Sequence, residues 1–340
     1  MAPASSRPHR LLYLSRNDVA HAGGSSSHLF VDAVARALHL HAGGGFAQPL
    51  KPYLRWRPDG HVADRIIAMP AYLGGSQPVA GIKWIGSRHD NARLGLDRAS
   101  ALVVLNDPET HFPVAVLEGG LISLWRTAAV TVLAARHLAR PHFRSVAVVG
   151  CGPVGTLQVR GLLEHATSVT EVRLFDLRPE AAETLAAAAA RRFPDVAFRV
   201  MPSAEESLRG AEVVVTATIA ASPWLPPEWL APGSFLSNVS LMDAFPEVLL
   251  EVDKVVVDDW DQCNREGKVI HRLVSEGRFS RADVHAELGQ VLVGDRPGRE
   301  DADERIALNP MGMAVEDVAC AQAVRDRALD AGIGTWLDLA

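Results

Sequence analysis

The chain has 340 residues, a formal net charge of −6 and an apolar content of 48%. At about 150 residues per domain, this length favours two domains, and the apolar content is enough for a sizeable core. The mild acidity, without any basic block, argues against a nucleic-acid partner. No apolar run reaches the roughly 20 residues that a membrane-spanning helix needs, so we expect no membrane partner.

The positions of the cysteines and histidines indicate whether the protein has disulfides or a metal site, and in which compartment it works. Cys151, Cys263 and Cys320 are far apart and form no Cys-x-x-Cys motif. The 13 histidines show no metal-ligand spacing, and the first ten residues lack the apolar segment of a secretory signal. We therefore expect a cytoplasmic protein without a disulfide framework and without a metal site.

The first part of the chain predicts a helix, a sheet and a second helix. Apolar residues at helical spacing predict a helix over 29–42, which the glycine run 43–45 ends. Residues 50–117 contain short β-rich segments separated by Gly, Pro and Asn-Asp, so they predict a sheet. A long alanine-rich helix is predicted over 122–139, before Pro141.

From Ser145 onward, strands alternate with helices. This alternation is typical of βαβ units and of a parallel sheet covered on both faces. The polar segment 294–306 is predicted to be a surface loop, and a helix after it, to about residue 329, is predicted to return to the N-terminal region. The predicted fold class is α/β, with a Rossmann doubly wound dinucleotide-binding domain over 127–312. An α+β domain would comprise 1–126 together with 313–340.

The segment "VAVVGCGPVG" places Gly150, Gly152 and Gly155 in a GxGxxG pattern between a strand and a helix. We expect Gly150 to allow the tight turn, Gly152 to let the backbone approach a pyrophosphate, and Gly155 to let helix and strand pack closely. Pro153 and Val154 complete this candidate cofactor loop. A phosphate would sit at the N-terminus of the following helix.

Asp176 ends the next strand, 21 residues after Gly155. A carboxylate there accepts hydrogen bonds from the adenosine ribose and repels a 2′-phosphate, which favours NAD over NADP, although the nearby Arg178 leaves NADP open. Thr216 and Thr218 end a later strand and are predicted to line the ribose side. Cys151, inside the loop, is interpreted as a small buried filler and not as a nucleophile.

Several segments resemble the ornithine cyclodeaminase/μ-crystallin family: "GIKWIG", "LISLWRTAAVTVLAARHLA", "VAVVGCGPVG", "VVVTAT", "NVSLMD" and "GMAVEDVA". The resemblance runs in order over roughly 12–330. It implies an NAD-dependent oxidoreductase that forms a homodimer, with a substrate-binding and dimerisation domain beside the Rossmann domain and an active site in the cleft between them.

Other segments, above all "LNPMGMAVED" and "QPLKPYLR", are similar to one branch of the family. That branch implies an oxidative hydrolysis of an adduct of glutamate, which releases L-2,3-diaminopropionate and 2-oxoglutarate for siderophores or peptide antibiotics. Alternatives within the family are an ornithine cyclodeaminase, a simple amino-acid dehydrogenase and a ketimine reductase. An alternative of another class is a non-catalytic cofactor-holding binder such as μ-crystallin.

The resemblance also implies functional residues. Arg126 matches the arginine that binds a substrate carboxylate, for which a guanidinium provides two parallel hydrogen bonds; a structural ion pair is the alternative. Lys83 matches the active-site lysine, with a lysine on a solvent-facing side of a strand as the alternative. Asp243 matches the catalytic aspartate, but this chain has Asp-Ala-Phe-Pro where relatives have Asp-x-Pro.

The remaining candidates are weaker. Lys51 and Arg65 are proposed for the other substrate carboxylates, and either is equally compatible with a solvated surface charge. Asn309 and Gly312 are expected beside the nicotinamide, where Gly312 would permit close approach and Asn309, as a substrate-binding residue, would donate a hydrogen bond. Asp317 is interpreted as no more than an acid in the first turn of the last helix.

Overall fold

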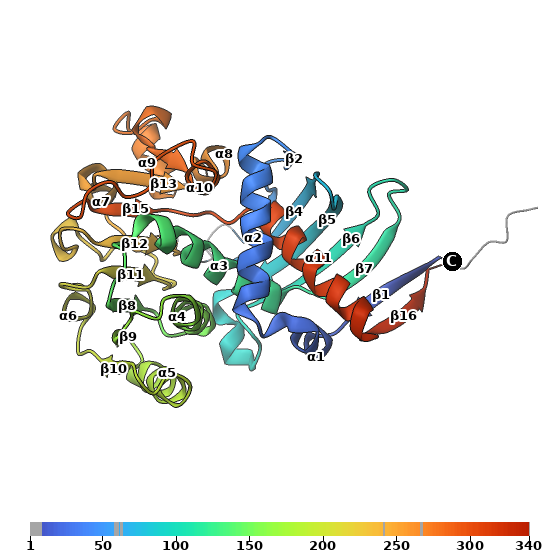
Figure 1. Cartoon of the computed structure of the whole chain (residues 1–340), viewed down its shortest axis with the longest axis horizontal. Coiled ribbons are helices and arrows are strands. Elements are labelled where there is room, and N and C mark those ends of the chain that lie inside the picture. The colour runs from blue at the N-terminus through green and yellow to red at the C-terminus, as the bar shows by residue number, and fades with distance from the viewer. Residues whose placement is uncertain (1–8, 58–60, 62–63, 241, 266–267, 340) are drawn as a thin grey trace, which may run out of the picture. The chain divides into compact units, whose positions relative to one another are not determined.

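The computed structural model describes residues 9–57, 61, 64–240, 242–265 and 268–339. The chain forms two compact units. The first unit comprises Met1–Ala33, Gly44–Ser123 and Ala314–Ala340, and the second comprises Val34–Gly43 and Leu124–Met313. Each is built around its own sheet (Figure 1).

The sheet of the first unit is mainly antiparallel. Its strand order is β16-β1-β7-β6-β5-β4-β2, with β3 also paired to β4, and only the β1–β7 pair among them is parallel. The strands are β1 (Arg10–Leu14), β2 (Phe46–Ala47), β3 (Tyr53–Leu54), β4 (Arg65–Leu73), β5 (Val79–Ser87), β6 (Ala99–Asn106), β7 (Pro113–Glu118) and β16 (Thr335–Asp338).

Helix α11 (Ala314–Ala331) packs against β4, β5 and β6. It also contacts the short helices α1 (Arg16–Val19) and η1 (Ala20–Gly24), and η2 (His89–Leu94) lies between β5 and β6 in the chain. The last helix therefore does return to the N-terminal region, as the sequence predicts. Alternation places Met69, Lys83 and Val103 at paired positions on the buried side of the sheet.

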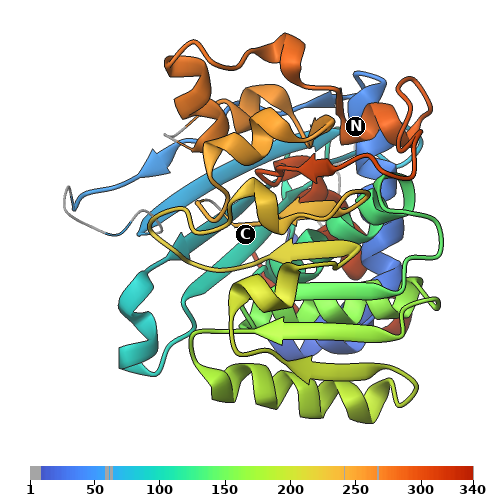
Figure 2. The ribbon, with the colours of Figure 1, turned by 90° about the vertical axis from the view of Figure 1, so that its left-hand side faces the viewer.

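The sheet of the second unit is entirely parallel and follows the order β10-β9-β8-β11-β12-β15-β13-β14 (Figure 2). Its strands are β8 (Ser145–Val149), β9 (Glu171–Phe175), β10 (Ala197–Val200), β11 (Val213–Thr216), β12 (Phe235–Asn238), β13 (Lys254–Val257), β14 (Ala286–Glu287) and β15 (Ile306–Leu308). The central strands are continuous apolar runs because both faces are covered. The predicted α/β fold class is confirmed.

Helices lie on both sides of this parallel sheet. The longer helices that belong wholly or partly to the second unit are α2 (Ser27–Ala42), α3 (Gly120–Leu138), α4 (Pro153–His165) and α5 (Pro179–Arg192). The shorter ones are α6 (Ala204–Leu208), η3 (Pro227–Trp229), α7 (Pro246–Glu251), α8 (Trp260–Cys263), α9 (Val269–Ser275), η4 (Arg281–Asp283) and α10 (Leu288–Leu292). Alternate strand residues form a core with α6, α7 and α9, whereas the opposite side of β8 faces α4 at Gly155.

The two units divide the chain differently from the predicted domains at residues 34–43. The second half of α2 belongs to the second unit because its side chains and backbone are held there. His41 Nε2 lies 3.0 Å from Asp259 Oδ2, and a Cβ on Gly289 would lie 2.7 Å from the carbonyl oxygen of Leu38. The helical spacing of apolar residues continues without interruption through residue 34. The assignment of the two halves of α2 to different units therefore follows only from their contacts.

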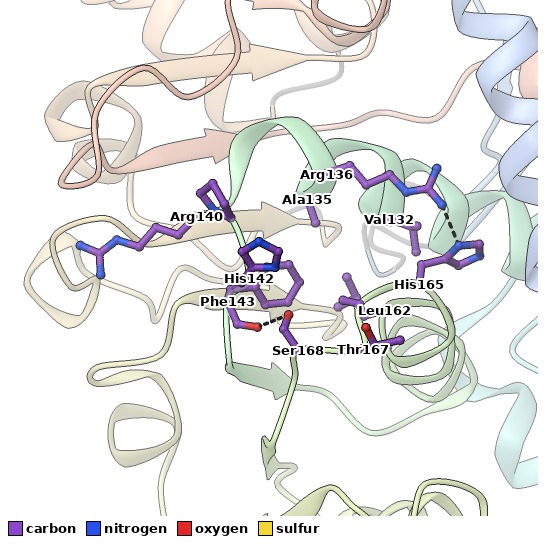
Figure 3. Close-up of a pocket in the computed structure, with 12 residues that line it drawn as sticks. Val132, Ala135, Arg136, Arg140, His142, Phe143, Leu162, His165, Thr167 and Ser168 are labelled. Atoms are coloured by element: carbon purple, nitrogen blue, oxygen red, sulfur yellow. Dashed lines mark hydrogen bonds between the residues drawn. The ribbon is translucent and has the colours of Figure 1, made fainter.

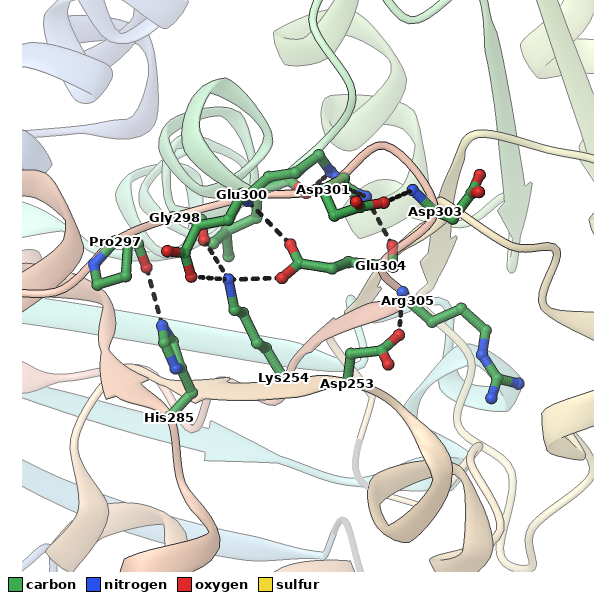
Figure 4. A network of polar contacts seen from close by, with 12 residues as sticks. Asp253, Lys254, His285, Pro297, Gly298, Glu300, Asp301, Asp303, Glu304 and Arg305 are labelled. Atoms are coloured by element: carbon green, nitrogen blue, oxygen red, sulfur yellow. Dashed lines mark hydrogen bonds and ion pairs between the residues drawn. The ribbon is translucent and has the colours of Figure 1, made fainter.

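The segment 294–306, predicted to be a surface loop, is tied to the second unit by a polar network (Figure 4). Lys254 Nζ donates to Gly298 O at 2.8 Å and lies 2.7 Å from both Glu300 Oε2 and Glu304 Oε1. Burial lowers the pKa of Lys254, but hydrogen bonds to the two glutamates outweigh it and raise the pKa above its usual value. The last residue of the segment, Ile306, begins β15, a strand that the sequence does not predict. Strands β1, β2, β14 and β16 are likewise not predicted.

Candidate active site

The glycine loop joins β8 to α4. Gly150 has φ +97°, and a Cβ there would lie 2.7 Å from the carbonyl of Ala217. A Cβ on Gly155 would overlap the carbonyl oxygen of Gly150. Both positions therefore exclude any larger residue, one because of the turn and the other because of the close contact between helix and loop.

Gly152 differs from these two because a Cβ there would meet nothing within 4 Å. It is the N-cap of α4, with Pro153 at the first helical position and no side chain capping the helix. Backbone N–H groups at such an N-terminus bind phosphate. The loop also lies where the chain order reverses, since β8 has β9 on one side and β11 on the other, and doubly wound sheets bind nucleotides at this place.

Asp176 lies at the carboxyl end of β9 and is held by the same loop. Its Oδ2 accepts from the backbone N–H of Cys151 at 2.8 Å, and its Oδ1 accepts from the N–H of Arg178 at 2.9 Å. Burial and the Asp176 charge raise the pKa of the Cys151 thiol to about 12. A thiol with that pKa remains protonated near neutral pH, so Cys151 is not an activated nucleophile.

A buried chain of polar side chains connects the ends of β11, β12 and β15. Thr216 Oγ1 donates to Asn238 Oδ1 at 2.8 Å, and Asn238 Nδ2 donates to Asn309 Oδ1 at 2.7 Å. Thr216 is predicted from the sequence to line the ribose and Asn309 to lie beside the nicotinamide, whereas no sequence motif selects Asn238. The network places the two predicted residues at the same edge of the sheet as the glycine loop, and Asn238 joins them.

Asp243 follows β12 and is completely buried. Its Oδ1 accepts from Thr218 Oγ1 at 2.5 Å, and its Oδ2 lies 3.4 Å from the Thr218 N–H. The carbonyl of Asp243 accepts from the N–H groups of Trp224 and Leu225, both at 2.9 Å. Asp243 thus joins the loop after β11 to the loop after β12. The longer Asp-Ala-Phe-Pro spacing is accommodated because Pro246 begins α7.

Arg126 lies in α3, partly buried, with its guanidinium directly against the α-carbon of Gly312. Gly312 has φ +73°, and a Cβ there would overlap Nη1 of Arg126. The close approach that the sequence analysis expected at Gly312 is therefore to this guanidinium. The backbone N–H of Gly312 donates to Asp258, a residue that the sequence analysis did not select.

Lys83 is 1% exposed on β5, which excludes the solvent-facing alternative. Its Nζ lies 2.5 Å from Oδ2 of Asp317 and donates to Ser123 Oγ at 3.1 Å. Asp317 is itself completely buried in α11. The interpretation of Asp317 as an ordinary first-turn acid is wrong, because the fold of the first unit brings it to Lys83.

The two weaker candidates also belong to the first unit. Lys51 is 3% exposed, so it is not a solvated surface lysine. Arg65 begins β4, is partly buried, and places its guanidinium 5.5 Å from the ring centre of Tyr53. The face of the Tyr53 ring attracts the guanidinium of Arg65 through a cation–π interaction.

The second unit also contains a cavity of about 200 Å³ at the C-terminal ends of α3 and α4 (Figure 3). Arg136 donates to His165 Nδ1 at 2.7 Å beside it, and Ser168 Oγ donates to Phe143 O at 2.8 Å. The 13 residues of α4 put this cavity roughly 20 Å from the glycine loop, at the opposite end of that helix.

None of the helices in the described ranges is long and apolar enough to cross a bilayer. Among the residues that the structure describes, no three His, Cys, Asp or Glu side chains gather in a way that could hold a metal ion.

Comparison with known proteins agrees with this combination of a parallel sheet, a glycine loop and a separate mixed sheet. The sequence model of the ornithine cyclodeaminase/mu-crystallin family matches residues 14–332, and the chain belongs to that family. It is 49% identical over 331 residues to N-((2S)-2-amino-2-carboxyethyl)-L-glutamate dehydrogenase of Staphylococcus aureus, covering 97% of this chain and 98% of the relative. Alanine dehydrogenase of Archaeoglobus fulgidus is 33% identical, over 90% of this chain and 92% of the relative.

Solved structures show the same fold over the full length. An archaeal alanine dehydrogenase dimer with bound NAD has a TM-score of 0.88 and 32% identity, covering 98% of this chain and all of that one. The Δ1-pyrroline-2-carboxylate reductase of Thermococcus litoralis, in complex with NADH and L-proline, has a TM-score of 0.89 and 26% identity, covering 96% and 99%.

Proposed function

We propose that the protein is an NAD-dependent oxidoreductase that acts on N-((2S)-2-amino-2-carboxyethyl)-L-glutamate. The products are L-2,3-diaminopropionate, 2-oxoglutarate, NADH and a proton, formed from the substrate, NAD⁺ and water. The observation that carries this choice of substrate is the 49% identity, over nearly the whole of both chains, with the S. aureus dehydrogenase of that name. The site geometry supports NAD-dependent oxidation of an amino acid, without distinguishing the substrate.

The residues present fit NAD. We expect a pyrophosphate to bind at the N-terminus of α4, where a Cβ on Gly152 would meet nothing within 4 Å, and the carboxylate of Asp176 to accept hydrogen bonds from ribose hydroxyls. NAD⁺, when bound, accepts a hydride. The glycine loop is proposed to hold the phosphates, and the carboxylate of Asp176 is proposed to disfavour a 2′-phosphate.

The substrate reaction has two stages. The Cα–H bond of the glutamate moiety breaks with loss of hydride, and the secondary amine loses its proton, which leaves a C=N double bond. Water then adds to that carbon, and the C–N bond breaks to release the amine of diaminopropionate and the keto group of 2-oxoglutarate. Both stages need a group that accepts a proton, and the first needs the substrate carbon to be held in place.

Arg126 is proposed to bind a substrate carboxylate with two parallel hydrogen bonds. The substrate carries three carboxylates, and Lys51 and Arg65 are proposed for the other two. Asp243 is proposed as the proton acceptor, with Thr218 holding its carboxylate through a 2.5 Å hydrogen bond. Lys83 is proposed to act as a proton-transfer and substrate-binding residue, oriented by Asp317 and Ser123.

The direct test mixes the purified protein with the synthetic adduct and NAD⁺ and follows NADH absorbance, with 2-oxoglutarate measured separately. We expect equal amounts of NADH and 2-oxoglutarate from the adduct and no NADH from ornithine. Proline and ammonia formed from ornithine without net NADH would identify a cyclodeaminase instead. NADH binding without turnover of any amino acid would identify a binder.

The proton acceptor is tested by Asp243→Asn. The amide keeps the size of the side chain but removes its basicity, so turnover should fall by about a hundredfold or more, the scale of a lost general base. NADH affinity, measured by fluorescence titration, should remain within about twofold, a shift of less than roughly 0.5 kcal/mol. Full activity in Asp243→Asn removes Asp243 from the mechanism.

We also propose a homodimer, in line with the archaeal alanine dehydrogenase dimer. The side of the first unit's sheet opposite Lys83 carries exposed apolar side chains, with Tyr72 39%, Trp84 43% and Leu102 47% exposed. Trp84 and Leu102 are directly paired across β5 and β6. Such a patch marks an interaction surface. Light scattering of the wild type and of Trp84→Lys tests this: the first should have the mass of two chains, the second of one.

A further inference from the structure

Asp258 is the first residue after β13 and is completely buried. Its Oδ2 accepts two backbone hydrogen bonds, from Met311 N–H at 2.8 Å and from Gly312 N–H at 2.5 Å. Its Oδ1 accepts from Asp259 N–H at 2.9 Å and from Cys263 Sγ at 3.1 Å. One carboxylate therefore receives four donors, and two of them fix the backbone that follows β15.

This backbone is the surface against which Arg126 lies. The guanidinium of Arg126 is so close to Gly312 that a Cβ there would overlap Nη1 and would lie only 2.9 Å from Cζ. The φ of +73° at Gly312 turns its N–H toward Asp258 while its α-carbon faces the guanidinium. Any shift of Gly312 changes the space in which the Arg126 side chain can orient.

Charge makes aspartate the suitable residue for this position. Hydrogen bonds from N–H groups to a carboxylate are shorter and roughly twice as strong as those to a neutral acceptor. An asparagine of the same size has one acceptor oxygen and an NH₂ group, and it would direct that NH₂ group at one pair of donors. In two of the four contacts, the NH₂ group of the asparagine would then face another hydrogen-bond donor. The buried donors in those two contacts would have no acceptor.

We propose that Asp258 is a positioning residue: by holding the N–H groups of Met311 and Gly312, it sets the orientation in which Arg126 binds the substrate carboxylate. This inference rests on the proposed role of Arg126 as the carboxylate-binding residue. Asp258 touches neither substrate nor cofactor in this scheme. We expect its effect on amino-acid binding to exceed its effect on cofactor binding, because its hydrogen bonds come from Asp259, Cys263, Met311 and Gly312 and not from the glycine loop at β8.

The experiment compares three full-length variants. Asp258→Asn removes the charge, and Gly312→Ala displaces the guanidinium directly while leaving Asp258 intact. Cys263→Ala is the matched control, because it removes the contacts of the thiol with Asp258 Oδ1 and with the carbonyl oxygen of Asn309 and leaves the hydrogen bonds from the N–H groups of Met311 and Gly312 in place. For each variant we would measure KM and kcat for the adduct, the dissociation constant of NADH, and a crystal structure.

We expect KM to rise at least roughly tenfold in Asp258→Asn and Gly312→Ala, since a displacement of about 1 Å in a positioning group can cost a hundredfold. The change in kcat should be smaller than the change in KM, and NADH affinity should stay within about twofold in Asp258→Asn and Cys263→Ala, a shift of less than roughly 0.5 kcal/mol. Cys263→Ala should lose stability but keep the wild-type KM. The structure of Asp258→Asn should show the Arg126 guanidinium moved relative to the rest of α3.

An unmoved guanidinium in Asp258→Asn, or an unchanged KM in that variant, overturns the inference. An equal rise of KM in Cys263→Ala overturns it as well, because the effect would then be general destabilisation. If Asp258→Asn fails to fold, Gly312→Ala decides: wild-type KM in that variant contradicts the dependence of Arg126 on this backbone. If the wild type does not oxidise the adduct, the proposed function is wrong. The role of Asp258 is then still tested by the crystal structures, which show whether the Arg126 guanidinium moves in Asp258→Asn.

Discussion

The buried pair of Lys83 and Asp317 allows a prediction of stability. In Asp317→Asn the ammonium of Lys83, which is 1% exposed, keeps Ser123 Oγ but loses its carboxylate. Removing one partner of a buried ion pair costs about 3–5 kcal/mol, because the other charge remains buried without compensation. We therefore expect Asp317→Asn to lower the free energy of unfolding by about 3–5 kcal/mol.

The assay is urea unfolding followed by tryptophan fluorescence, at one protein concentration for all variants because subunit association shifts apparent stability. The double variant Lys83→Met/Asp317→Leu removes both charges and should be more stable than either single variant, since apolar replacements of a buried pair are often neutral or stabilising. It should nevertheless be inactive. A loss below about 1 kcal/mol in Asp317→Asn, the scale of a solvent-exposed pair, would refute the reasoning.

Three further predictions follow from local geometry. Gly155→Ala should abolish NADH binding in a fluorescence titration, because its Cβ would overlap the carbonyl oxygen of Gly150; retained affinity would contradict the described loop. Cys151 should resist alkylation by iodoacetamide at neutral pH, as mass spectrometry of the labelled peptide can show, since burial and Asp176 raise the pKa of its thiol to about 12. Burial raises the pKa of Glu304, but the hydrogen bond from Lys254 and backbone N–H groups outweigh it and hold the pKa below its usual value. A lowered pKa in the folded state stabilises the protein above the unfolded-state pKa, and this contribution is lost as pH falls through the folded-state value. The Tm difference between wild type and Glu304→Gln should therefore be present at neutral pH and disappear in acid; a difference that persists unchanged there would exclude the charged pair as its cause.

Much of the parallel sheet was predictable because its signals are local. A buried parallel strand is an uninterrupted apolar run, and a glycine-rich turn after it leads directly into a helix. The roles of Gly150, Gly155 and Asp176 depend on neighbours within one βαβ unit, so their spacing was sufficient to select them. The edge strands β14 and β16 were missed because they are short, with two and four residues. Strand β1 is internal, between β16 and β7, and both of these partners lie far from it in the chain.

The amino-acid sequence by itself determined the fold class, the cofactor loop and, through motifs that resemble a family, the selection of Lys83, Arg126 and Asp243. Only the tertiary structure decided what holds these side chains. Asp317 reaches Lys83 across 234 positions of the chain, and Asp258 reaches Gly312 across 54. A carboxylate in a helix or after a strand looks alike in sequence whether it faces water or a buried donor. Its partner is fixed by how the strands and helices pack, and that packing depends on the whole hydrophobic core of each unit.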